Sequence, residues 1–229
     1  MKKSAVAIVL AAGQGKRMGG QVAKQYLLIE EKPLLYYTLQ AFEKSMVEEV
    51  VLVVGRGEEA FCQSEIVDRY GFTKVACVIC GGAERYHSVY EGLKQIKDAE
   101  YVLIHDGARP CITKELINKT IEEVKKKKAC VVGVPVKDTI KVVDESGAVV
   151  KTPNRNTLMI TQTPQAFTYE MVYKAYRKLE QSNVENITDD AMVVETMLAE
   201  TVYMIPGSYT NIKVTTPEDL EIAAQFLGK

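Results

Sequence analysis

The residues whose types and spacing best suit chemistry lie in segment 10–25, which has the sequence LAAGQGKRMGGQVAKQ. Gly13 and Gly15 allow backbone N–H groups to approach an anion closely. Arg17 and Lys24 add cationic side chains to the same segment, which suits a polyphosphate whose charge is met by side chains as well as by amides. The segment therefore predicts a site for a phosphate-rich ligand, although glycine-rich loops with basic residues are also frequent in solvated turns.

Two common nucleotide-binding motifs do not fit this segment. Met18 stands where the dinucleotide fingerprint requires its third glycine, and the second apolar run, Val50–Val54, is followed by Gly55 and Arg56 instead of an acidic residue. The Gly-Lys-Ser/Thr ending of a P-loop is also missing. These departures disfavour a nicotinamide-dependent oxidoreductase, which we keep with a non-catalytic nucleotide-binding domain as the alternative class.

Two further motifs follow apolar runs. The segment Gly81-Gly-Ala-Glu-Arg-Tyr-His-Ser88 precedes a helical pattern, where amides can bind a base edge or a phosphate, although an ordinary glycine-initiated helix would have the same sequence. The segment His105-Asp-Gly-Ala-Arg-Pro110 ends a strand pattern. The carboxylate of Asp106 could hold Mg²⁺ near phosphates or could cap a turn. With two histidines in the chain, a histidine metal centre or a Ser-His-Asp triad is disfavoured.

The elements that must position these motifs alternate along the chain. Apolar, β-branched runs predict strands, and amphipathic stretches predict the helices between them. The strands are expected at 5–10, 50–54, 75–79, 101–105 and 130–134, and the helices at 33–45, 58–70, 84–97 and 113–127. Strands that are apolar throughout and joined by helices predict an α/β fold with a doubly wound, mostly parallel sheet.

The pattern changes after Lys137. Two segments, 139–143 and 148–152, alternate with period two around a turn and predict a β-hairpin. An isolated hairpin is marginally stable, so it should lean either on a second subunit or on its own domain. Helices at 168–181, 188–198 and 217–227 and a strand at 201–205 complete a single predicted domain, 1–229, with an arm at 137–155.

Composition restricts the class of protein. The 29 basic and 30 acidic residues give a net charge of −1, which disfavours a general nucleic-acid or membrane-surface binder. No segment approaches the ~20 apolar residues of a membrane span. The apolar run Ala5–Ala12 after two lysines resembles a short secretory signal but fits a buried strand better. Five cysteines, with Cys77 and Cys80 on opposite faces of a strand, predict reduced thiols and a cytoplasmic protein.

Taken together, the motifs resemble those of the sugar-phosphate nucleotidyltransferases and, within them, the 2-C-methyl-D-erythritol 4-phosphate cytidylyltransferase family. The resemblance rests on the motifs above and on Pro135-Val-Lys-Asp-Thr139, Thr163-Pro-Gln165, Thr188-Asp-Asp190 and Asn211-Ile-Lys213, which span essentially the whole chain in order. Leu10, Asp190 and Thr210 depart from residues frequent in that family. The ribitol-5-phosphate cytidylyltransferases, which share much of the pattern, are the second alternative.

This resemblance implies transfer of a cytidylyl group from CTP to methylerythritol phosphate by a Mg²⁺-dependent homodimer. It assigns catalysis to Arg17, Lys24, Arg155 and Lys213. It assigns nucleotide binding to Ala11, Ala12, Gly13, Gly15, Gly81, Gly82, Ala83, Ser88, Asp106 and Gly107. Asp106 would also contact the metal ion, and the remaining substrate contacts would come from Thr139, Arg109, Thr163 and Thr188. The attacking phosphate is ionised near neutral pH, so no general base is expected.

Overall fold

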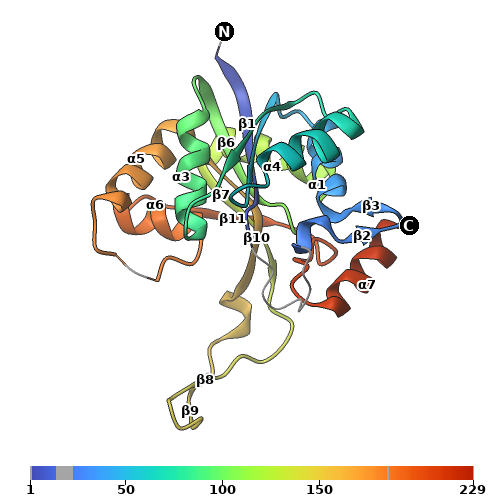
Figure 1. Cartoon of the computed structure of the whole chain (residues 1–229). Helices are drawn as coiled ribbons and strands as arrows, with labels where there is room; N and C mark the ends of the chain where they lie inside the picture. The colour runs from blue at the N-terminus through green and yellow to red at the C-terminus, as the bar shows by residue number, and fades with distance from the viewer. Residues whose placement is uncertain (1, 14–22, 185, 229) are drawn as a thin grey trace.

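A seven-stranded sheet forms the centre of the protein, with helices on both sides (Figure 1). The structure is a computed structural model that describes residues 2–13, 23–184 and 186–228. The strands lie in the order β11-β7-β10-β6-β1-β4-β5. Their bounds are β1 (Lys3–Ala11), β4 (Glu49–Val54), β5 (Val75–Cys80), β6 (Ala99–Asp106), β7 (Ala129–Pro135), β10 (Met159–Thr168) and β11 (Tyr203–Pro206). All neighbouring pairs are parallel except those of β10, which is antiparallel to both β6 and β7.

Strand β1 shows why the sheet needs cover on both faces. Its residues Ala5 to Val9 are fully buried, and alternate ones belong to different hydrophobic clusters. Ala7 packs in the first cluster and Ile8 in the second, because successive side chains of a strand point to opposite faces. Burying one Val, Leu or Ile side chain contributes about 1.5–3 kcal/mol, so the apolar strands stabilise the fold only when both faces are covered.

Helices provide this cover in two layers. The first layer comprises α1 (Leu34–Glu43), α2 (Glu59–Cys62) with its π-helical continuation Gln63–Asp68, and α4 (Lys114–Lys127). The second comprises α3 (Arg85–Gln95), α5 (Tyr169–Glu180) and α6 (Asp190–Leu198). The last helix, α7 (Pro217–Leu227), packs apart from these layers on a smaller cluster that contains Ile29, Leu34 and Val214. No helix within the described ranges is long and apolar enough to cross a membrane.

The predicted α/β fold is confirmed, and each predicted strand of the sheet is present with ends displaced by at most two residues. Strand β10 was not predicted from the sequence. Its central residues Thr161–Gln165 are polar except for Pro164, and its pairing with β7 changes register between Thr161 and Gln165. The short hairpin of β2 (Leu28–Ile29) and β3 (Lys32–Pro33) was also not predicted.

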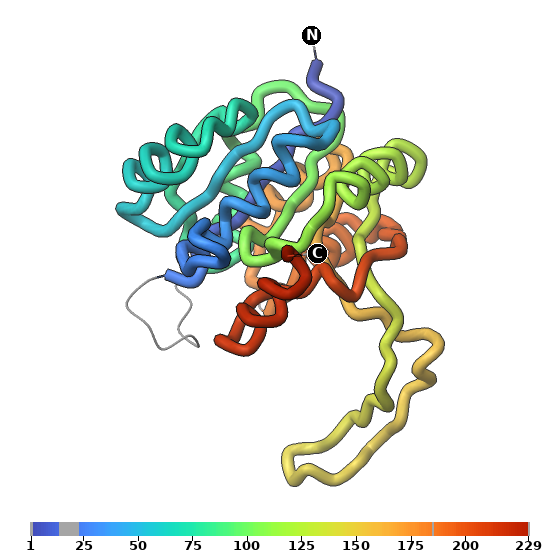
Figure 2. Tube along the Cα trace, turned by 90° about the vertical axis from the view of Figure 1, so that its right-hand side faces the viewer, coloured from blue at the N-terminus to red at the C-terminus, as the bar shows by residue number. Residues whose placement is uncertain are grey.

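The chain forms a second hairpin from β8 (Val142–Val143) and β9 (Val149–Lys151), which pair antiparallel. It extends away from the sheet and its helices (Figure 2). Val149 is 58% exposed and Val150 is 67% exposed, so the domain does not cover these apolar side chains. The turn is closed by Asp144, whose Oδ1 accepts hydrogen bonds from the backbone N–H groups of Ser146 and Ala148 at 2.9 and 3.0 Å. The hairpin therefore does not lean on its own domain.

Candidate active site

A cavity of about 820 Å³ opens at the carboxyl ends of β1, β4, β5 and β6. In the sheet, β1 lies between β4 on one side and β6 on the other, and the chain passes first to β4 and later to β6. This position is therefore the switch point at which α/β proteins bind ligands. We call this cavity the cleft. Predicted site residues that line it are Ala11, Ala12, Gly13, Lys24, Gly81, Gly82, Ala83, Ser88, Asp106 and Lys213.

The turn before α3 lines the cleft with backbone. Gly81 donates its N–H to the Val54 carbonyl at 2.8 Å, and a Cβ at this position would lie 2.7 Å from both the Cβ of Ala12 and the Oγ of Ser88. Gly82 donates its N–H to Ser88 Oγ at 3.1 Å, and Ser88 Oγ donates to the Glu84 carbonyl at 3.2 Å. Glycine is required here because any side chain would displace the turn from β1 or from the helix.

Asp106 is the charged centre of the cleft. Its carboxylate lies 2.9 Å from Lys213 Nζ, 3.4 Å from Arg85 Nε and 3.6 Å from Arg109 Nε. Its backbone N–H donates to Thr163 Oγ1 at 3.1 Å. Burial would raise the pKa of Asp106, but Arg85, Lys213 and Arg109 hold it well below its usual range. Asp106 is therefore an anion at neutral pH, and its orientation is fixed by its neighbours.

The fit of a metal ion depends on Asp106. Across the described ranges, no group of three or more His, Cys, Asp or Glu side chains could hold a metal ion. Mg²⁺ retains several waters and is commonly held by one or two carboxylates together with substrate phosphates. A single carboxylate in a phosphate-sized cleft fits such an ion, provided that the nucleotide supplies other ligands.

Lys24 enters the same cleft from a short 3₁₀ helix, Lys24–Tyr26. Its Nζ donates to the Val214 carbonyl at 3.2 Å, next to Lys213 in the chain. The following residues fix this segment to the end of β4, because Gln25 Nε2 and Tyr26 Oη donate to Glu58 Oε2 at 3.3 and 2.8 Å. Two cationic side chains far apart in sequence are thus brought to one cavity.

Three predicted residues lie behind the lining of the cleft. Gly107 packs closely on β1, since a Cβ there would lie 3.0 Å from the Leu10 carbonyl oxygen. Arg109 donates to the Asn211 carbonyl at 2.8 Å and is 9% exposed. Thr163 is 4% exposed, and its hydroxyl lies 3.0 Å from His105 Nδ1. Burial lowers the pKa of His105 to about 3, so this histidine is a neutral structural partner.

Three other predicted residues, Thr139, Arg155 and Thr188, do not line the cleft of this chain. Thr139 and Arg155 belong to the hairpin region, where both are exposed, and Arg155 Nη1 donates to the Lys137 carbonyl at 2.9 Å. Thr188 is exposed before α6. Gly15 and Arg17 lie outside the described residues. The roles of all these residues in substrate binding or catalysis stay predictions.

Sequence reasoning missed several side chains of the cleft. Arg56, Glu58 and Arg85 line it, although none of them was assigned a role from the sequence. Arg85 could have been found, because it lies within the Gly81–Ser88 motif that had already been singled out. Glu58 could not have been identified from the sequence, because its role depends on hydrogen bonds donated by the segment that begins at Lys24.

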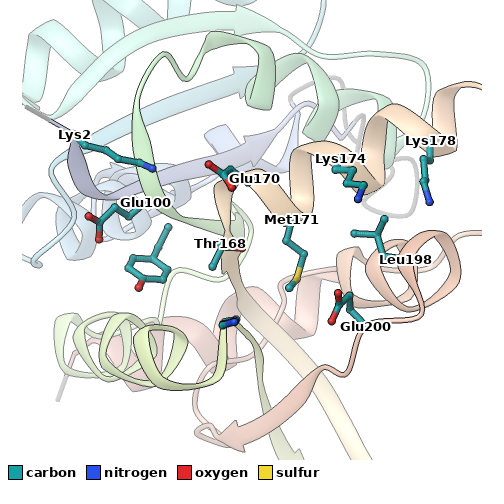
Figure 3. A pocket seen from close by; sticks show the side chains of 11 residues that line it. Lys2, Glu100, Thr168, Glu170, Met171, Lys174, Lys178, Leu198 and Glu200 are labelled. Atoms are coloured by element: carbon teal, nitrogen blue, oxygen red, sulfur yellow. The ribbon is translucent and has the colours of Figure 1, made fainter.

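A second cavity, of about 580 Å³, lies at the amino ends of β1, β6 and β7, on the side of the sheet opposite the cleft. Figure 3 shows the side chains that line it. The cavity is lined by charged side chains of both signs, among them Lys2, Glu100, Glu170, Lys174 and Glu200. No residue predicted to bind nucleotide or substrate lines this cavity. The site that the sequence motifs define is therefore the cleft at the carboxyl edge.

The fold and the cleft define a doubly wound α/β protein whose candidate ligand site is lined by a backbone turn and by lysine side chains. Residues 5–229 match the family model described as IspD: 2-C-methyl-D-erythritol 4-phosphate cytidylyltransferase. The chain therefore belongs to the 2-C-methyl-D-erythritol 4-phosphate cytidylyltransferase family.

Individual relatives agree over nearly their full length. The enzyme of this name from Lachnoclostridium phytofermentans is 52% identical, with 96% of this chain and 95% of the relative covered. That from Alkaliphilus metalliredigens is 51% identical, with 97% and 92% covered. The crystal structure of 4-diphosphocytidyl-2C-methyl-D-erythritol synthase from Anaerococcus prevotii superposes with a TM-score of 0.87 at 34% identity, with 99% and 97% covered.

Proposed function

We propose that this protein transfers a cytidylyl group from CTP to 2-C-methyl-D-erythritol 4-phosphate, giving CDP-methylerythritol and pyrophosphate. The observation that carries the proposal is the convergence of Lys24, Lys213 and Asp106 with the backbone turn of Gly81–Ser88 in one cleft. The family relationship supplies the identity of the two substrates. The cleft supplies cations and amides, which are the groups that a transfer between two phosphate compounds requires.

The reaction needs positioning and charge neutralisation more than proton transfer. A phosphate oxygen of methylerythritol phosphate attacks the α-phosphorus of CTP, and the bond to the β-phosphate oxygen breaks as pyrophosphate leaves. Because the second pKa of a phosphate monoester is about 6, the nucleophile is ionised without a general base. Lys24, together with Arg17, would stabilise the negative charge that develops around the α-phosphorus. Lys213 and Arg155 would hold the attacking phosphate in line.

The nucleotide would lie along the ends of β1, β5 and β6. The turn at Gly81–Ser88 lines the cleft with backbone, which would suit hydrogen bonding to a cytosine edge. Asp106 would face the ribose and contribute one ligand to Mg²⁺. When bound, the ion would offset the repulsion between the triphosphate and the incoming phosphate.

We further propose that the protein acts as a homodimer in the cytoplasm. Arg155 and Thr139 lie at the base of the hairpin. The apolar side chains of this hairpin are exposed, because its own domain does not cover them. A second copy of the chain would cover them and bring Arg155 to the cleft of its partner. All five cysteines are free thiols, which suits a reducing compartment.

A pyrophosphate-release assay tests the reaction. Turnover is expected with CTP and methylerythritol phosphate. It should fall strongly when ATP or GTP replaces CTP, and it should stop in excess EDTA. Ribitol 5-phosphate serves as the competing acceptor, because the ribitol enzymes share much of the sequence pattern. Equal turnover with ribitol 5-phosphate would contradict the assigned acceptor, and equal turnover with ATP would contradict the assigned nucleotide.

A further inference from the structure

Arg85 is held by carboxylates on two sides of its guanidinium. Its Nη1 and Nη2 donate to the two oxygens of Asp190 at 2.8 Å each, and its Nε lies 3.4 Å from Oδ1 of Asp106. A guanidinium has five N–H donors in a fixed plane, and three of those of Arg85 are directed at protein carboxylates. Although Arg85 lines the cleft, its geometry suits a bridge between two side chains better than a phosphate ligand.

Asp190, at one end of this bridge, begins α6, and the residues on either side of it are fixed to the sheet. It is fully buried, and its Oδ1 also accepts a hydrogen bond from Tyr176 Oη at 2.5 Å. Gln165 of β10 holds the start of α6 with both ends of its amide, accepting from Ala191 N–H at 2.8 Å and donating to Asp189 at 3.0 Å. A buried carboxylate that loses its cation is strongly destabilised, so Arg85 remains with Asp190 when a ligand enters the cleft.

Asp106, at the other end, depends on the same strand. Thr163 of β10 accepts the backbone N–H of Asp106 at 3.1 Å, two residues before Gln165. The backbone of Asp106 is thus fixed, and its side-chain orientation depends on Arg85, Lys213 and Arg109. Without Arg85, the carboxylate would keep cations on the Oδ2 side, where Lys213 and Arg109 lie, and would lose the contact that holds Oδ1.

We propose that Arg85 and Asp190 form a positioning pair that orients the carboxylate of Asp106 and the Gly81–Ser88 turn for CTP. Neither residue contacts CTP in this role. Arg85 lies within this turn as the first residue of α3, and its link to α6 prevents the helix from shifting away from β6. The inference deepens the proposed function, because it rests on CTP as the nucleotide in the cleft.

The test compares Asp190→Asn, Arg85→Gln and the double variant with the wild type. CTP dissociation constants are measured by calorimetry in the presence of Mg²⁺, and KM and kcat are measured by pyrophosphate release. Each single variant is expected to raise the CTP dissociation constant and KM about tenfold, with kcat reduced no more than about threefold. The double variant should bind CTP within about twofold of the weaker single variant, because the two residues act as one unit.

Tyr169→Phe provides a matched control on α5. The Tyr169 hydroxyl donates to the carbonyls of Leu93 and Ile96 at the other end of α3, at 3.3 and 3.1 Å. Its loss should lower the melting temperature while CTP affinity stays within about twofold of the wild type. This control separates a general loss of stability between α3 and α5 from a specific loss of orientation at Asp106.

If Asp190→Asn does not fold, Arg85→Lys provides the second variant. A lysine keeps a positive charge beside Asp190 but cannot pair with both of its oxygens and also contact Asp106. It should fold and bind CTP about tenfold more weakly. CTP affinity within twofold of the wild type in the folded variants, or losses that multiply in the double variant, would overturn the positioning pair. Wild-type protein that binds no CTP would instead overturn the proposed function.

Discussion

The cleft and the β8–β9 hairpin hold their charged residues in different ways. In the cleft, the carboxylate of Asp106 lies between Arg85 and Lys213, and the residue as a whole is 7% exposed. In the hairpin region, Arg155 is exposed and donates to the Lys137 carbonyl of its own arm. The cleft is organised by contacts within one chain, whereas the hairpin presents its residues to the surroundings.

This difference separates two requirements of the proposed reaction. The nucleotide site must be ordered before CTP binds, and a network of buried ion pairs provides this order. The phosphate of the second substrate must be held by cations near the α-phosphate, and one chain brings Lys213 but not Arg155 to the cleft. Substitutions in the cleft should therefore act within a chain, and substitutions in the hairpin should act across the dimer.

The largest effect is expected from Lys24→Ala. The ammonium group would stabilise charge in the transition state, so its loss should lower kcat/KM by about two orders of magnitude or more. Lys174→Ala provides the control, because this lysine lines the second cavity, on the side of the sheet opposite the cleft, and should leave turnover unchanged. Steady-state pyrophosphate release measures both. Near-normal turnover in Lys24→Ala would remove Lys24 from the catalytic residues.

A smaller loss is expected from Arg155→Ala. Removal of one cation from the attacking phosphate should lower kcat/KM for methylerythritol phosphate about 10- to 100-fold and leave the dissociation constant of CTP unchanged. The free energy of unfolding should change by less than about 0.5 kcal/mol, because the side chain is exposed.

The control for this variant is Lys151→Ala, which removes another exposed cation from the same hairpin. It should keep wild-type kinetics. Equal losses in Arg155→Ala and Lys151→Ala would show that the hairpin acts through its total charge, and that Arg155 has no specific contact with substrate.

The smallest effect concerns the pH dependence of the hairpin turn. Hydrogen bonds from the Ser146 hydroxyl and from backbone N–H groups, including that of Ala148, hold the pKa of Asp144 below its usual value. Because the folded pKa is the lower one, the carboxylate stabilises the turn above the unfolded value of about 3.9. This contribution is lost as the pH falls through the folded pKa.

Amide NMR signals of Ser146 and Ala148 should therefore shift on acidification below about pH 4, before the domain unfolds. In Asp144→Asn the same signals should show no such transition, since an amide does not titrate. A transition that persists in Asp144→Asn would assign the pH dependence to another group.

The sequence predicted the sheet because its parallel strands are mostly apolar, and those at its centre are buried on both faces, as Val50–Val54 shows. It did not predict β10, because Thr163 and Gln165 are polar side chains that bond to Asp106 and to the start of α6. A local pattern of hydrophobicity does not contain such pairings, which connect distant parts of the chain.

The candidate site shows the same limit. The glycines and Asp106 were predicted because they follow apolar strands, where ligand sites of α/β proteins lie. The partnership of Arg85 with Asp190 joins residues 105 positions apart, and neither residue identifies the other in a single sequence. The position of Arg155 relative to a cleft depends on a second chain, which a single sequence also does not describe.

The central claim is that each active site combines Lys24 of one chain with Arg155 of the other. Purified Lys24→Ala and Arg155→Ala proteins are mixed in equal amounts, subunit exchange is verified, and pyrophosphate release is measured. Random pairing makes about half of the dimers mixed, and each mixed dimer has one site with neither substitution. Activity should rise well above that of either variant, to about a quarter of the wild-type value. No increase after verified exchange would place Arg155 in the cleft of its own chain and contradict the account.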